Sequence, residues 1–145
     1  MPIVKTIKGD IVEMLKEKSV RLVALPANCI REQDGITATV MEEFPSLIEL
    51  DKEFALPSLY RLGDYSLANL EGSGVLLFYL HLNNYQENRI EFSALKSCLK
   101  KLSMEAISAG NYIELAFPKL EENWDIIKKI LSFQEHLLIT IIEND

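Results

Sequence analysis

Hydrophobic residues follow two periodicities that alternate along the chain. Runs that are apolar at every position or at every second position predict strands at 3–7, 20–25, 60–70, 75–82, 112–117 and 136–142, the third of them interrupted at 63–64. Apolar residues three or four positions apart predict helices after residue 10 and over 35–44, 46–54, 88–104 and 124–131. The helix over 88–104 has the clearest signal, because its apolar residues form one continuous stripe.

The alternation of strands with helices predicts the fold class. Several strands are apolar on both faces, which is typical of a sheet covered on both sides. We expect a single α/β domain over 1–145, a three-layer α/β/α sandwich around a mixed, mostly parallel sheet. In such sheets a ligand site lies where loops leave the carboxyl ends of the strands, here at 9–10, 27–35 and 118–123.

Charge and cysteine content narrow the classes of function. The net charge of -7 disfavours the phosphate neutralisation on which nucleic-acid affinity depends, so no nucleic-acid partner is expected. Cys29 and Cys98 fit no metal or redox spacing, and we expect neither a metal site nor a cofactor. The longest apolar run, 75–82, is too short to cross a membrane, and the first residues do not resemble a signal peptide. These features predict a cytoplasmic protein without membrane contact.

Four short motifs occur in an order that resembles the macro-domain family, and in particular its short phage and yeast members that act on ADP-ribose derivatives. They are Gly9-Asp10-Ile11 after a strand; Asn28-Cys29 with Gly35-Ile36 and Phe44-Pro45; Leu62-Gly63-Asp64 with 67–70; and 113–118 with Trp124. The succession covers nearly the whole chain. The small size would suit a phage accessory protein.

The resemblance implies a ligand site and assigns residues to it. The positions that match the family's ligand-binding motifs are Asp10, Ile11, Asn28, Gly35, Ile36 and Pro118. The resemblance implies that Asp10 binds the adenine amino group and that Asn28 lies beside the distal ribose. Two alternatives stay open from the residues alone: Asp10 with Glu13 forms a helix-capping box, and Asn28 can bond its own loop backbone.

The two phosphate-binding loops depart from the family pattern. Several glycines usually precede the position of Gly35, but 31–35 contains only that one. Between Pro118 and Trp124 there is no glycine, and Glu121 and Glu122 place two carboxylates where a phosphate would approach a helix start. We therefore expect a reduced or lost ADP-ribose pocket.

Candidates for catalysis are few. Asp34 is the carboxylate next to Gly35 and could orient a water, although an Asp before Gly is commonly a turn former. Arg31 could pair with a phosphate or be solvated, and His81 and His136 read as packed or capping residues.

The sequence thus predicts a macro-domain-like binding module. It acts either on a nucleotide-type ligand, such as ADP-ribose or a related nucleotide, or through protein contact. One alternative is an ADP-ribosyl hydrolase or ADP-ribose phosphate phosphatase that uses Asn28 and Asp34. Another is an acidic module that binds a basic protein partner and no ligand.

Overall fold

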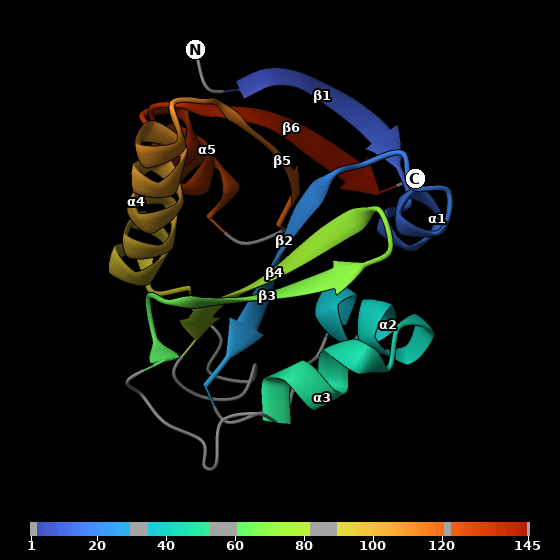
Figure 1. The fold of residues 1–145 in the computed structure, drawn as a ribbon. Coiled ribbons are helices and arrows are strands. Elements are labelled where there is room, and N and C mark those ends of the chain that lie inside the picture. Colours follow the sequence, from blue (N-terminus) through green and yellow to red (C-terminus); the bar gives the residue numbers. More distant parts are fainter. Residues whose placement is uncertain (1–2, 30–34, 53–60, 82–89, 121–122, 145) are drawn as a thin grey trace.

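The computed structural model describes residues 3–29, 35–52, 61–81, 90–120 and 123–144. The strands among these residues form one six-stranded sheet (Figure 1). Its order is β1 (Ile3–Gly9), β6 (Leu137–Asn144), β5 (Ile113–Pro118), β2 (Leu22–Asn28), β4 (Ser73–His81) and β3 (Tyr65–Leu70). Every neighbouring pair is parallel except β3 with β4, which form an antiparallel hairpin. The sheet is mixed and mostly parallel, as the sequence predicts.

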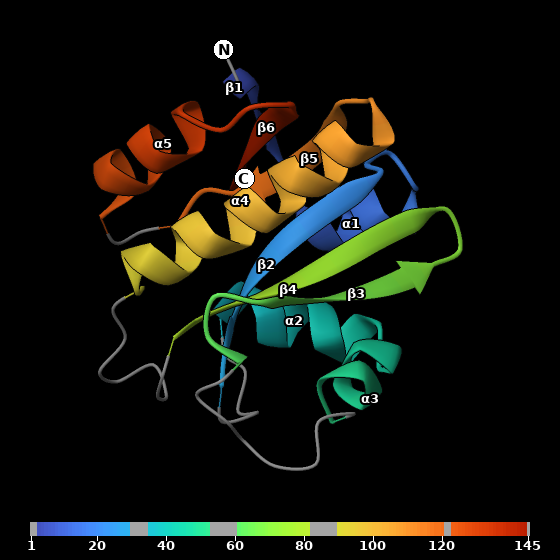
Figure 2. The ribbon, with the colours of Figure 1, turned by 60° about the vertical axis from the view of Figure 1, so that its left-hand side comes forward.

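Helices cover both faces of the sheet. The helices on one face are α1 (Ile11–Lys16), α2 (Gly35–Glu43) and α3 (Ser46–Lys52), and those on the other are α4 (Phe92–Ala109) and α5 (Trp124–Ser132) (Figures 1 and 2). The prediction of a three-layer α/β/α sandwich is confirmed. In the described part of the chain, no helix is both long and apolar enough to traverse a bilayer.

Strand β4 shows how one apolar run serves two hydrophobic layers. Leu76 and Phe78 belong to the core under α4 and α5, whereas Leu77 and Tyr79 belong to the core under α1, α2 and α3. Successive side chains of a strand point to opposite faces, so a strand buried on both faces must be apolar at every position. This explains why the run at 75–82 carries no charge.

Three elements differ from their predicted bounds by more than about two residues at one or both ends. Strand β2 continues through Pro26 to Asn28, although proline was expected to end it. Its pairing with β5 is confined to Val23 and Ala116, so Pro26 lies where that side of β2 makes no ladder hydrogen bonds with β5.

Strand β3 begins only at Tyr65, because Gly63 adopts a left-handed turn conformation (φ 82°). Helix α4 extends beyond residue 104 to a left-handed Gly110.

Candidate functional site

The predicted ligand-binding residues lie at one edge of the sheet. Strands β1, β6, β5, β2 and β4 are parallel, so their carboxyl ends share that edge. Asp10 follows β1, Asn28 is the last residue of β2, Pro118 is the last residue of β5, and Gly35 begins α2. The structure therefore brings together the motifs that the sequence assigns to a ligand.

Helices α1 and α2 present their first turns to this edge side by side. An ion pair joins Lys16 at the end of α1 to Glu43 at the end of α2 (Nζ to Oε2, 3.3 Å). Helix α1 starts directly after β1, and Thr37 in the first turn of α2 is bonded to Pro26 near the end of β2, so both helices start at this edge. Their positive dipole ends therefore both lie at the carboxyl edge of the sheet.

Asp10 caps α1, as the capping alternative predicts. Its Oδ1 accepts hydrogen bonds from the backbone N–H of Val12 (2.8 Å) and of Glu13 (3.3 Å). The reciprocal half of a capping box is not formed, because the Glu13 carboxylate lies 3.8 Å from the Lys16 ammonium instead. Asp10 is exposed, and among the described residues its Oδ2 has no partner. One carboxylate oxygen is therefore committed to the helix and the other can accept from a ligand.

Asn28 is part of the sheet, not of the loop that follows. It pairs with His81 across β2 and β4, at an irregularity in the register, and is only 2% exposed. Its side chain therefore lies below the surface at this edge and would form the floor of a ligand site there. The side chains of Ile11 and Pro118 are likewise buried and that of Ile36 is half-buried, so a ligand could meet these three residues mainly through their backbone.

Gly35 opens α2 in a conformation that suits close approach. It is exposed, has a left-handed φ of 58°, and a Cβ built on it would find no atom of the described residues within 4 Å. The first turn of α2 has no acidic residue, and the Thr37 hydroxyl anchors it to β2 by donating to the Pro26 carbonyl (2.5 Å). The first N–H groups of a helix have no intrahelical partner, and such groups are a favourable place for an anion.

The start of α5 has the opposite electrostatics. Asp125 lies in its first turn, and Asn123 precedes it with a left-handed φ of 54° and no side-chain cap. The ammonium of nearby Lys119 lies 3.7 Å from the Glu143 carboxylate, which offsets its charge. Glu121 and Glu122, predicted to repel phosphate here, lie outside the described residues. Asp125 acts in the same sense, because it already occupies the positive end of the helix dipole.

A buried polar cluster at the carboxyl end of β4 was not predicted from the sequence. Arg61 and Asp51 form an ion pair with side chains 3% and 5% exposed (2.5 Å). The Tyr79 hydroxyl donates to the same Asp51 oxygen (3.1 Å), and the Arg61 guanidinium lies 3.9 Å from the centre of the Tyr79 ring. Ser66 is within 3.3 Å of the Tyr79 hydroxyl. These residues come from α3, β3, β4 and the turn before β3, so no local spacing could have revealed them.

This cluster lies beside the segment that carries Asn28, because Tyr79 is the register partner of Ala27 on the neighbouring strand. Burial raises the pKa of the Cys29 thiol, while the charge of Arg61 lowers it and that of Asp51 raises it. Burial also raises the pKa of Tyr79 to about 12, which keeps its hydroxyl protonated as a donor. The cluster therefore joins α3 to β3 and β4 next to the end of β2.

The described residues offer little for covalent chemistry at this edge. Burial raises the pKa of both thiols, that of Cys98 to about 12, so neither is a ready thiolate. His136 precedes β6 at the opposite edge of the sheet and stacks on Tyr112 (centroids 5.2 Å apart), as expected of a packed histidine. No group of potential metal ligands occurs among the described residues. Asp34, the predicted catalytic residue, lies outside them, as do Arg31 and the side chain of His81.

No protein-family model matches the sequence, and no curated protein matches it. Solved structures do. The chain is similar to the macrodomain of Thermus aquaticus DarG (12% identity, TM-score 0.66, 97% of both chains covered). It is also similar to the macrodomain of Mycobacterium tuberculosis DarG (14%, 0.69, 98% of this chain and 97% of that one). A macrodomain protein from Streptomyces coelicolor gives comparable values (13%, 0.70, 97% of both chains). The resemblance to short phage and yeast members stays a prediction, and what the comparisons establish is that this chain has the macrodomain fold.

Proposed function

We propose that the protein is a binding module for a nucleotide-type ligand smaller than ADP-ribose, held at the carboxyl edge of the sheet. The macrodomain fold and the macro-domain motifs at Asp10, Asn28 and Gly35 support a ligand of this family. The helix starts of α2 and α5 differ in charge, and this difference supports a ligand smaller than ADP-ribose. The first turn of α2 contains no acidic residue, and a Cβ at Gly35 meets none of the described residues, whereas the first turn of α5 holds Asp125. Asp34, which precedes Gly35, lies outside the described residues.

One phosphate can therefore be bound where a diphosphate cannot. At about 4 Å and an effective dielectric near 20, a carboxylate opposes a phosphate by on the order of 4 kcal/mol before relaxation. A penalty of that size cancels the binding free energy that a second phosphate would gain at the start of α5. In this proposal Asp10 receives the adenine amino group on Oδ2, the start of α2 receives the phosphate, and Asn28 lies in the floor between them.

Isothermal titration calorimetry with adenosine monophosphate (AMP) and with ADP-ribose tests the proposal. We expect AMP to bind, and ADP-ribose to bind no more than about threefold more tightly and more weakly than about 10 μM. Binding of neither would overturn the proposal in favour of a module that acts through protein contact. The hydrolase alternative depends on Asp34 and stays a prediction. Loss of ADP-ribose phosphate turnover in Asp34→Ala would support it.

Substitution of Asp10 separates its two roles. Asp10→Asn keeps an oxygen for the N–H groups of Val12 and Glu13 but replaces Oδ2 by a donor, so we expect unchanged stability and about tenfold weaker AMP binding. Asp10→Ala removes the cap and should cost about 1 kcal/mol of unfolding free energy. Urea denaturation and AMP titration of both variants give the two readouts. Wild-type AMP affinity in Asp10→Asn would show that the residue serves only the helix.

A further inference from the structure

Among the described residues, the outer edge of β3 lacks the charges, prolines and register shifts that commonly protect a sheet edge. Within the described residues no strand pairs with this side of β3, and the hairpin register is regular over all six residues. The strand reads Tyr-Ser-Leu-Ala-Asn-Leu, without a charge or a proline. Exposed backbone groups on such a strand are a template for another strand.

The opposite edge of the sheet shows what protection looks like in this protein. Strand β1 carries Lys5 and Lys8, both exposed, and its register with β6 is broken between Ile3 and Lys5. Lysines and irregular register prevent strand addition. The same chain therefore blocks one edge and leaves the other open.

The surface beside the β3 edge is partly apolar and only partly covered. Leu67 projects from the face of β3 that lies toward α4 and is 53% exposed, and Met104 on α4 is 56% exposed. A groove of about 620 Å³ runs between α4 and the start of β3, with Tyr65, Met104, Lys100 and Lys101 among its lining residues. An added strand would cover Leu67 and one side of this groove.

We propose that this edge pairs with the same edge of a second copy of the chain, which joins two sheets about a twofold axis. The Asp64 carbonyl accepts from the Tyr79 amide (3.0 Å). Because backbone groups alternate along a strand, those of Tyr65, Leu67 and Asn69 point away from β4. The Tyr65 amide already donates to the Asp64 carboxylate (2.9 Å). An antiparallel pair centred on Leu67 uses the remaining outward groups, which are the Tyr65 carbonyl and the backbone groups of Leu67 and Asn69. It sets Leu67 opposite Leu67 of the second copy and buries both side chains on the α4 face.

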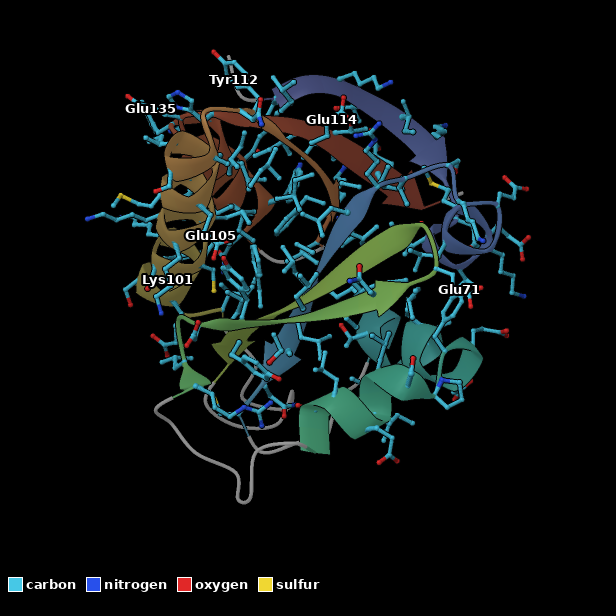
Figure 3. The ribbon with its side chains drawn as sticks, viewed as in Figure 1. Glu71, Lys101, Glu105, Tyr112, Glu114 and Glu135 are labelled. Atoms are coloured by element: carbon cyan, nitrogen blue, oxygen red, sulfur yellow. The ribbon has the colours of Figure 1, made fainter. Side chains whose placement is uncertain are left out.

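Charge at the two ends of β3 favours this self-pairing. Lys101 and Glu105 lie on α4 near the start of the strand, whereas Glu71 lies at the hairpin turn beyond its end (Figure 3). Lys101 is bound to Asp64 (3.3 Å), and the Tyr65 hydroxyl is bound to Glu105, which leaves Lys100 without a pairing partner among the described residues. A twofold axis at Leu67 brings Glu71 of the second copy to the end that carries Lys100. The attraction occurs twice in the dimer.

Sedimentation velocity over about 5 to 500 μM protein tests the pairing. The mass of the wild type, 16.5 kDa as a monomer, should double as concentration rises. Leu67→Lys places two ammonium groups opposite each other on the axis and should weaken association at least tenfold. Ile126→Lys is the matched control, because Ile126 is a similarly exposed apolar residue on α5 (46%) and should associate as the wild type does.

A charge-swap experiment tests the orientation of the two copies. Glu71→Lys alone and Lys100→Glu alone each create like-charge contacts at both ends and should associate more weakly than wild type. An equimolar mixture of the two variants restores opposite charges at both ends, and should form a mixed dimer of wild-type strength. A wild type that stays monomeric at the highest concentration, or a mixture no tighter than its components, would overturn the proposal.

Discussion

Replacement of Asp51 by alanine is expected to lower the free energy of unfolding by about 3 to 5 kcal/mol. The substitution leaves the Arg61 guanidinium, whose side chain is only 3% exposed, without the carboxylate that compensates its charge. It also removes the acceptor of the Tyr79 hydroxyl. Urea denaturation followed by circular dichroism measures the loss. Because Asp51 holds Tyr79, whose strand partner Ala27 precedes Asn28, we also expect weaker ligand binding wherever the variant remains folded.

Two controls separate the buried charge from general damage. The double variant Asp51→Leu with Arg61→Met removes both charges at similar volume and should recover most of the lost stability. Lys101→Met breaks an exposed ion pair with Asp64, with side chains 50% and 57% exposed, and should change stability by less than about 1 kcal/mol. A single Asp51 variant as mild as Lys101→Met would contradict the role given to the cluster.

Gly35→Asp should weaken AMP binding at least tenfold relative to Gly35→Asn. Both side chains have the same shape, and both tolerate the left-handed φ of 58° at this position. They differ by one negative charge at the start of α2, where we place the phosphate. A phosphate at this position is repelled by the Asp carboxylate and can accept from the Asn amide, so both differences weaken binding to Gly35→Asp. Equal affinities would place the phosphate elsewhere.

The reciprocal substitution at α5 has the opposite sign. Asp125→Asn removes the negative charge in the first turn of that helix and should strengthen the binding of ADP-ribose while leaving that of AMP unchanged. Calorimetry with both ligands on wild type and variant gives the comparison. An equal change for the two ligands would show that Asp125 acts at long range instead of on a second phosphate.

Local patterns were sufficient for the layers of the fold and for one detail of the site. The strand and helix periods predicted the mixed sheet, and the residues after β1 predicted the cap that Asp10 forms. They misplaced the end of β2, because whether a proline interrupts a strand depends on which neighbour needs its N–H. That information lies in the sheet order, which depends on contacts between residues far apart in the chain.

The site was predictable only where its residues belong to contiguous motifs. Asn28 was predicted as a site residue, but its burial depends on the pairing of β2 with β4. The ion pair of Arg61 with Asp51 under Tyr79 was not predictable, because each residue alone is an ordinary surface or sheet residue by type. Tertiary packing gives these three side chains their common position.

We propose that the carboxyl edge of the sheet accepts one phosphate and rejects a second. The most direct test is the ratio of the AMP dissociation constant to that of ADP-ribose, measured on the wild type at one salt concentration. We predict a ratio near one, with ADP-ribose weaker than about 10 μM. A ratio above about 10, with ADP-ribose bound more tightly than that limit, would contradict the account.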